Sequence, residues 1–514
     1  MIGWNFPSNG GGQIYGVATA GIQTFKGKEF SSLARETCQN SLDAVKDETS
    51  PVTVEFHQYE IDTKDIPDYR NFMKILQACK SFWRKKSDKA EIFLKEAILR
   101  LKFPKTSVLR ISDFNTTGLS KPFDPHAMEG WNALIKIDGG ATKDSDSAGN
   151  FGIGKNATFA NSFCRMIFYR TLNEQSERAA QGVTKLVSFY LDSFKISAGT
   201  GYYGDPRGNL PVSLIPELDE LFLRNKIGTD VFIYGFSGGK NWHDELIREL
   251  IDNFLVAIHR DKLRFKVQGV TLNKNNLREF VTNNAADYYR ILTGDGAVKF
   301  FELNFHGMGK LKLGVLIDSA ASLNRRVLIV RKSGMKLFDL DRISRTLSFT
   351  AILELEGSKL NAFFREMETP SHDGWEPTRY AKSPALAKKL LTELKHWVRE
   401  TIQSLGEVSD GESDDDLSKN FNRARSKIKT PTADGKVDSD KIRVIRVDEK
   451  NYRLVLKIPK NFSRGQIEIS AVNEDNVDEK IFITPTNSAD SSSQILTIGD
   501  AINTRKNSRP EIDK

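Results

Sequence analysis

The chain has 514 residues, of which 39% are hydrophobic and 28% charged, and its formal net charge at pH 7 is +8. This length is too great for one hydrophobic core and predicts two large domains with a smaller one. The apolar content excludes a largely disordered chain. The charge is mild for a chain of this size, so it permits contact with DNA without requiring it.

Targeting and cysteine patterns indicate the compartment. No run of apolar residues approaches the length of a membrane span, and the first residues lack the plan of a signal peptide. The three cysteines, Cys38, Cys79 and Cys164, lie far apart and have no paired spacing. We therefore expect a reduced cytoplasmic protein without membrane contact, disulfides or a zinc site.

Residues 1–238 alternate helical and strand patterns and form the first expected domain. A helix is expected at 30–46, and strands are expected at 52–59, 107–112, 164–171, 184–191 and 230–235. The long basic pattern at 68–101 predicts an inserted pair of helices. Residues 119–148 have few regular signals and become rich in Gly, Ser and Asp, which indicates a mobile loop.

The second expected domain covers residues 239–405. We expect helices and strands there in the order helix 243–260, strands 263–272, 311–318, 325–332 and 346–355, and helix 384–404. Residues 406–440 combine an acidic run with a basic one and predict a flexible linker. Alternation at 441–502 predicts a small β-sandwich, followed by a tail at 503–514. The expected class is therefore α+β: an α/β sandwich, a second α/β domain and a small C-terminal β domain.

The helix at 30–46 presents three polar groups on one face. Glu36, Asn40 and Asp43 stand at i, i+4 and i+7, which places them within roughly 60° of arc on a helix. A carboxylate one turn from a neutral oxygen ligand suits metal-assisted hydrolysis, because one group can orient water while the other holds the cation. An ordinary amphipathic surface helix would show the same triplet, so the triplet alone does not decide between these readings.

Two further motifs lie at the ends of expected strands. In Asp113-Phe114-Asn115-Thr116-Thr117-Gly118, an acidic residue enters a turn and can accept a hydrogen bond from an exocyclic amine. Gly228-Thr229 opens the last strand of the first domain. Each motif by itself is equally compatible with a plain junction between a strand and a turn.

A glycine-rich motif precedes the strand at 164–171. Gly149, Gly152 and Gly154, followed by Lys155, would let backbone N–H groups converge on an anion. The segment also satisfies the first seven positions of a P-loop. However, Asn156 stands where a P-loop has Ser or Thr, and the preceding residues are polar instead of a buried strand. We therefore reject the P-loop.

Taken in order, the patterns E-x-x-x-N-x-x-D-A, D-x-N-x-T-G, G-x-x-G-x-G and G-T resemble those of the GHKL ATPases. This superfamily includes gyrase-type topoisomerases, the heat-shock chaperone, histidine kinases and MutL-type repair proteins, which share the Bergerat ATP-binding fold. The first and third patterns look most like the chaperone and MORC-like branches. The resemblance covers the first expected domain and, more loosely, the second, which would match the transducer domain of split members.

The resemblance implies that ATP and Mg²⁺ bind in the first domain. Glu36 would be the general base that deprotonates the attacking water, and Asn40 would bind Mg²⁺ through its side-chain oxygen. Asp113 would accept the adenine amino group with support from Thr229. The other implied nucleotide-binding residues are Asp43, Asn115, Gly118, Gly149, Gly152, Gly154 and Lys155, and a lid would span about 119–148.

One departure from the family pattern concerns the adenine turn. Asn115 stands where the family has its first glycine, and one additional residue precedes Gly118. Asparagine tolerates positive φ better than most residues, so the turn remains feasible.

Split members of the superfamily also supply a lysine from the transducer domain to the terminal phosphate. Lys332 is our first choice for this lysine and Lys336 the second, although a solvated strand end would look the same. The implied function is an ATP-hydrolysing switch whose nucleotide gates homodimerisation, acting with a protein partner or with DNA. A role in antiviral defence or chromosome handling would fit. The alternatives are a histidine-kinase-type phosphotransferase, with His396 as acceptor, and the ATPase motor of a nucleic-acid processing complex.

Overall fold

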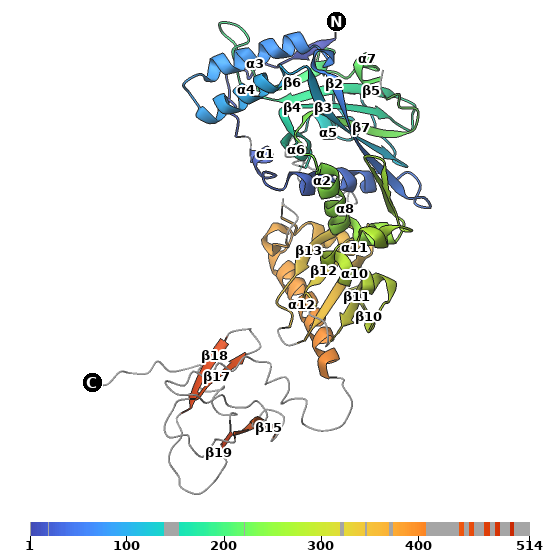
Figure 1. The fold of residues 1–514 in the computed structure, drawn as a ribbon, viewed down its shortest axis with the longest axis vertical. Coiled ribbons are helices and arrows are strands. Elements are labelled where there is room, and N and C mark those ends of the chain that lie inside the picture. Colours follow the sequence, from blue (N-terminus) through green and yellow to red (C-terminus); the bar gives the residue numbers. More distant parts are fainter. Residues whose placement is uncertain are drawn as a thin grey trace, which may run out of the picture. The chain divides into compact units, whose positions relative to one another are not determined.

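The computed structural model describes residues 2–18, 20–137, 154–219, 222–318, 323–344, 347–369 and 374–407, together with strands between 442 and 497. The chain divides into two compact units (Figure 1). The first consists of Met1–Asp341 and Phe349–His396, and the second of Arg342–Ser348 and Trp397–Lys514. No helix in the described ranges combines the length and apolar character needed to cross a membrane.

The first unit contains a mixed sheet of nine strands, in which all neighbours run antiparallel except β2 and β8. The spatial order is β1 (Gly3–Asn5), β6 (Thr200–Gly204), β5 (Arg178–Lys185), β4 (Ser162–Leu172), β7 (Gly228–Phe236), β3 (Lys105–Phe114), β2 (Val52–Asp62), β8 (Leu263–Val267) and β9 (Val270–Leu272). Short helices connect these strands: α1 (Ala20–Gln23), the 3₁₀ turn Thr63–Asp65, α5 (Gly130–Ile135), α6 (Asn156–Ala160) and α7 (Pro216–Asp219).

The nine-stranded sheet is buried on both faces, because successive residues of its central strands point to opposite sides. On β4, Ile167 and Tyr169 belong to a core shared with α2 (Glu29–Asp43) and α8 (Trp242–His259). The intervening Phe168 belongs to a second core, which α3 (Tyr69–Trp83) and α4 (Asp88–Arg100) close. The expected helix pair at 68–101 is thus confirmed, and it covers one face of the sheet.

The boundary that we placed at 238 is too early for this sheet. The segment after it adds two strands, because β8 pairs in parallel with β2 through the register Val52↔Leu263. The strand expected at 263–272 is instead a hairpin of β8 and β9, whose two-residue turn has positive φ at Gln268 and Gly269. Periodicity reports which residues are apolar but not which distant strand they pair with, so the boundary could not be placed from it.

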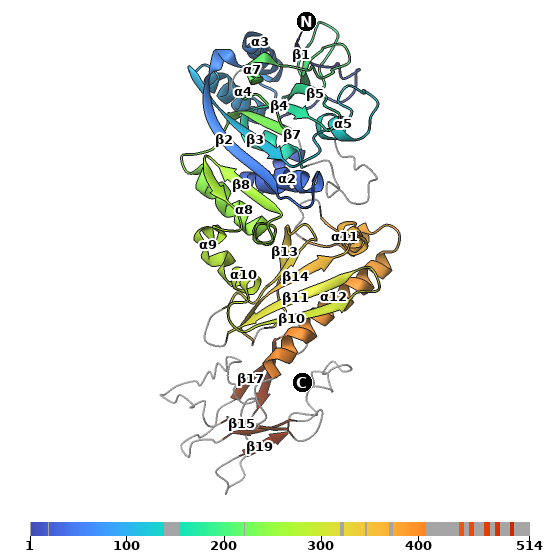
Figure 2. The ribbon, with the colours of Figure 1, turned by 90° about the vertical axis from the view of Figure 1, so that its right-hand side faces the viewer.

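A five-stranded sheet follows in the first unit (Figure 2). Its order is β10 (Val298–Asn304), β11 (Lys310–Ile317), β14 (Phe349–Glu356), β12 (Val327–Val330) and β13 (Lys336–Leu340), with only β12 and β14 parallel. The helices of this part of the chain are α9 (Leu277–Phe280), α10 (Asn283–Thr293), α11 (Ser358–Arg365), the 3₁₀ turn Pro377–Arg379 and α12 (Pro384–Glu407), whose residues from Trp397 onward belong to the second unit. We did not predict β10, which is a largely exposed edge strand and therefore lacks a clear apolar alternation.

Two other expectations of the first domain need correction. The strand expected at 184–191 ends at Lys185, and the apolar residues Leu186, Val187 and Phe189 are buried without being part of a strand. The expected loop at 119–148 contains α5 in its described part. Trp131 on this helix is fully buried, and its indole nitrogen donates to Gln181 Oε1 over 3.3 Å. One large anchor residue therefore orders this part of the loop.

The second unit contains antiparallel strands. β15 (Ile442–Arg446), β16 (Tyr452–Leu456) and β19 (Gln494–Thr497) form one sheet, and β17 (Ile467–Val472) pairs with β18 (Asp478–Ile483). These strands agree with the β character expected for 441–502. The expected linker and tail lie almost entirely outside the described residues. The mixed sheets of the first unit are consistent with the expected α+β class.

Candidate functional site

Helix α2 has the two-faced character that its sequence predicts. Leu33, Ala34 and Cys38 are fully buried, whereas Glu36 is half-buried and Asn40 is exposed. Asp43, the last helical residue, is also exposed. The helix therefore packs on the sheet and presents its carboxylates and carboxamide away from the core.

The side chain of Glu36 lies directly against Gly154, the last glycine of the predicted phosphate-binding motif. A Cβ atom built on Gly154 would lie 1.6 Å from Glu36 Oε2 and 2.5 Å from Cδ. Only glycine can occupy this position without displacing the carboxylate. The approach brings together two motifs that are far apart in the sequence.

Asp113, near the end of β3, is held by groups from three other segments. The hydroxyl of Thr116 donates to Asp113 Oδ1 over 2.6 Å, and the backbone nitrogen of Thr229 donates to the same oxygen over 2.7 Å. The hydroxyl of Ser41 on α2 shares its proton between the backbone oxygen of Thr37 at 2.9 Å and Asp113 Oδ2 at 3.3 Å. Gly228 permits this approach, because a Cβ there would lie 2.6 Å from Asp113 Oδ1. Helix α2 and strands β3 and β7 thus meet at one carboxylate.

The electrostatic setting of Asp113 leaves it able to accept another donor. Burial raises the pKa of its carboxyl group, although Arg224, Thr116 and Thr229 favour the ionised form. The donors to Oδ1 are strong, whereas the bond from Ser41 to Oδ2 is long. A carboxylate oxygen can accept two hydrogen bonds, so Oδ2 retains capacity for a ligand amine.

A buried ion-pair network supports this part of β7. Asp230 binds Arg170 over 2.8 Å and Arg224 over 2.6 Å, and all three side chains are less than 8% exposed. Burial opposes the charge of Asp230, but the two arginines outweigh it and hold its pKa below the ordinary value. Arg224 also donates to the backbone oxygen of Asp113 over 3.0 Å. The network therefore ties the carboxylate-bearing end of β3 to β7.

The turn after Asp113 contains both departures from the family pattern, namely Asn115 and the additional residue before Gly118. Asn115 adopts φ 61°, and its side-chain nitrogen donates to the backbone oxygens of Asp47 and Ser50 over 2.9 and 2.8 Å. Its side chain thus fastens the loop at 47–51. Gly118 has φ 68°, and a Cβ there would lie 2.6 Å from the oxygen of Leu172. Glycine is needed here for both its dihedral angle and its close contact with β4.

The remaining glycine-motif residues are only partly described. Gly149 and Gly152 lie outside the described residues. Lys155 is buried, and its ammonium donates to the backbone oxygen of Ile137 over 2.5 Å, which ties the start of α6 to the segment after α5. Lys185 at the end of β5 donates to Asn156 Oδ1 over 2.8 Å, which adds a second cation beside this motif.

Sequence reasoning did not single out Ser41, Thr116 or Arg224, which all contact Asp113. Ser41 could have been found, because it lies between the two carboxylate-bearing turns of α2 and faces the sheet. Arg224 has no local pattern around it. Its role depends on the return of the chain to β7 and is visible only in three dimensions.

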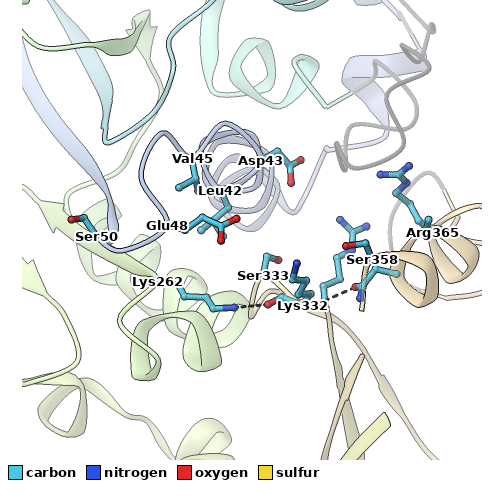
Figure 3. Close-up of a pocket in the computed structure, with 13 residues that line it drawn as sticks. Leu42, Asp43, Val45, Glu48, Ser50, Lys262, Lys332, Ser333, Ser358 and Arg365 are labelled. Atoms are coloured by element: carbon cyan, nitrogen blue, oxygen red, sulfur yellow. Dashed lines mark hydrogen bonds between the residues drawn. The ribbon is translucent and has the colours of Figure 1, made fainter. Parts of the chain in front are cut away.

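A cavity of about 350 Å³ lies between the end of α2 and the turn from β12 to β13 (Figure 3). Leu42, Asp43 and Glu48 line it on one side, and Lys332 lines it on the other. Asp43 is the one predicted residue of α2 among its lining residues, so the cavity adjoins the site around Glu36 and Asp113 without containing it. Further cations on its wall are Lys262, Arg331 and Arg365.

The two candidate lysines differ in their surroundings. Lys332 is exposed at the cavity, and its backbone is held by Asn361 Oδ1 over 3.1 Å and by the ammonium of Lys262 over 2.6 Å. Lys336 is instead paired with Asp339 over 2.7 Å. The geometry therefore favours Lys332 as the lysine that can reach a ligand.

Comparison with protein-family models and with curated proteins finds no match for this chain. Among the described residues, no cluster of three or more His, Cys, Asp or Glu side chains is placed to hold a metal ion. A Mg²⁺ ion beside Asn40 would thus take its other ligands from phosphate oxygens and water, which is how this ion usually binds with nucleotides.

Proposed function

We propose that this protein is an ATP-binding and ATP-hydrolysing conformational switch of the GHKL type. The observation that carries the proposal is the convergence of motifs around α2. Glu36 on this helix abuts Gly154, and Ser41 on the same helix bonds to Asp113, which also accepts from Thr229. These residues come from distant segments, and each has the chemistry that one part of a nucleotide requires.

The residues fit an adenine nucleotide at both of its ends. Asp113 Oδ2 retains acceptor capacity, which suits the amino group of adenine. At the other end, Gly154 belongs to the glycine-rich segment proposed to meet the phosphates, and its lack of a side chain leaves room for the Glu36 carboxylate there. Lys155 directly after Gly154 is the N-cap residue of α6, whose N-terminal N–H groups add partial positive charge.

The proposed chemistry assigns each group of α2 a separate task. Glu36 orients a water molecule and accepts its proton during attack on the terminal phosphate. Asn40, one turn further along, offers its side-chain oxygen to Mg²⁺, which when bound neutralises charge on the phosphates. Because Gly154 has no side chain, the Glu36 carboxylate can lie directly against the proposed phosphate-binding segment.

Lys332 is the residue proposed to couple ATP hydrolysis to a conformational change. It lies on the turn after β12, across the cavity from Asp43 on α2. Closing this cavity would deliver a positive charge toward the phosphates, and a charge aimed at the transition state speeds the reaction. ATP binding would thus favour the closed form and dimerisation of the protein, with a protein or DNA partner responding to that change.

Size-exclusion chromatography with light scattering tests this function. Glu36→Gln should bind ATP without hydrolysing it and should therefore accumulate as an ATP-dependent dimer, whereas ADP should leave it monomeric. Wild type should dimerise only transiently. A mass that nucleotides leave unchanged, together with transfer of labelled phosphate to the protein, would favour a kinase and contradict the switch.

A further inference from the structure

The segment from α3 to just beyond α4, including the turn between the two helices, carries most of the net charge of the chain. They lie side by side, and they join β2 to β3, whose facing ends already pair through Asp62↔Lys105 (Figure 1). Residues 69–102 contain ten lysines and arginines and three acidic residues, a net charge of +7, and the whole chain has +8. The rest of the molecule is therefore nearly neutral.

The charged residues on the outer face of α3 are all positive. Its inner face buries Phe72, Ile75, Leu76, Cys79 and Phe82 in the core against the sheet. On the opposite side, five exposed residues fall within roughly 80° of arc at 100° per residue, and none of them is acidic. They are Arg70, Lys74, Gln77, Ser81 and Arg84.

Among the described residues these cations form no salt bridge, in contrast to Lys95 and Arg100 of α4, although Glu91 lies near Arg84. On α4, Lys95 pairs with Glu91 over 3.0 Å and Arg100 pairs with Glu96 over 3.4 Å. Within the described part of the chain, the cations of α3 and of the turn that follows it form no salt bridge. They are Arg70, Lys74, Lys80, Arg84, Lys85 and Lys86, and Lys89 at the start of α4 likewise forms none. Like charges one helical turn apart repel each other and destabilise the free protein. A bound polyanion would remove this repulsion.

We propose that the basic face formed by α3, the turn after it and the start of α4, defined as Arg70, Lys74, Arg84, Lys85 and Lys89, binds the phosphate backbone of double-stranded DNA. All five side chains are exposed. Arg70 and Arg84 stand fourteen residues apart on and just after α3, which at 1.5 Å per residue spans about 21 Å, enough for several consecutive phosphates. The face thus offers a row of cations to a regular polyanion.

The chemistry of the face favours duplex DNA over other polyanions. Its outward residues on α3 include no aromatic side chain, whereas single-stranded nucleic acid is bound by stacking of bases on aromatics. A helix suits the wide major groove of B-form DNA, while the major groove of A-form RNA is too deep and narrow to admit one. An acidic membrane is the main competitor, because α4 exposes the apolar residues Ile92 and Leu99, and Phe103 just after the helix is exposed as well.

Fluorescence anisotropy with the full chain, without nucleotide, tests the proposal independently of the ATPase. The probe is a labelled DNA duplex of random sequence and about 30 base pairs, titrated at several salt concentrations from about 50 to 200 mM. Each phosphate contact contributes about 0.9 to the slope of log affinity against log salt, so five contacts predict a slope of about −4.5. The variant Arg70→Glu, Lys74→Glu, Arg84→Glu should lose at least about tenfold in affinity, and its slope should become shallower by about 2.7, reaching about −1.8.

The matched control is Lys299→Glu, Lys388→Glu, Lys395→Glu, which makes the same change in net charge at exposed positions of β10 and α12. It should bind the duplex nearly as well as wild type. Equal losses in both variants would show a nonspecific effect of net charge and overturn the proposal. Wild type that binds phosphatidylserine vesicles or an RNA duplex more tightly than DNA, or that fails to bind DNA at the lowest salt, would also overturn it.

Discussion

Gly154→Ala offers the sharpest test of how Glu36 is held. The new Cβ would lie 1.6 Å from Glu36 Oε2, and contacts of Cβ atoms below 3.0 Å are essentially never seen. The carboxylate must therefore move by at least 1.4 Å. Because the atoms in the way are the end of a flexible side chain, the free energy of unfolding should change little. A general base displaced by about 1 Å loses about 10²-fold in rate, so the turnover number for ATP should fall by about that factor.

The assay is steady-state phosphate release, paired with urea denaturation and ATP binding on the same samples. Gly239→Ala is the control, because a Cβ at that position meets no atom within 4 Å. In a double-mutant cycle, Gly154→Ala should add almost no further loss to Glu36→Ala, since the displaced group is already gone. A Gly154→Ala variant that turns over ATP at nearly the wild-type rate would refute the reasoning.

Three further outcomes follow from the structure. Asp230→Asn leaves two buried arginines without their carboxylate and should lower the free energy of unfolding by about 3–5 kcal/mol in urea denaturation. Asp205→Asn, which removes an exposed pair, should not shift the urea midpoint measurably. Lys332→Ala should lower the turnover number by about 10²-fold, whereas Lys336→Ala should have little effect. Since burial raises the pKa of Asp113 and a bound amine favours its ionised form, ATP affinity should rise with pH from about 4 upward until the carboxyl group is fully ionised.

Each of these outcomes has a result that would contradict it. Equal stabilities of the two aspartate variants would mean that the buried network is not needed for the fold. A larger loss for Lys336→Ala than for Lys332→Ala would transfer the proposed role to Lys336. The pH effect should disappear in Asp113→Asn, and calorimetry showing the same pH dependence in that variant would assign the titration to another group.

Much of the local structure could be predicted from the sequence because it follows from periodicity. Helix α2 and the strands around Asp113 and Thr229 lie where alternation and helical spacing place them. The pairing of α3 with α4 was also evident from a long amphipathic pattern. These elements depend on interactions between residues that are near in sequence, so local patterns record them.

The features that escaped prediction depend on contacts between distant segments. The parallel pairing of β2 with β8, which moved the expected domain boundary, leaves no local signal. The pairing of Arg224 with Asp230 and its contact with the backbone of Asp113 likewise require the chain to return to β7. The side chain of Asn115, expected at the nucleotide, is instead committed to the loop at 47–51, because an asparagine amide can replace backbone partners in a turn.

Titration calorimetry of the wild-type protein with ATP, ADP and GTP in the presence of Mg²⁺ tests the central claim most directly. A carboxylate acceptor at Asp113 matches the amino group of adenine, whereas guanine presents an oxygen acceptor at the corresponding position. We predict one adenine nucleotide per chain, much weaker binding of GTP, and loss of this preference in Asp113→Ala. Heat signals that show no nucleotide uptake, or equal binding of ATP and GTP, would contradict the account.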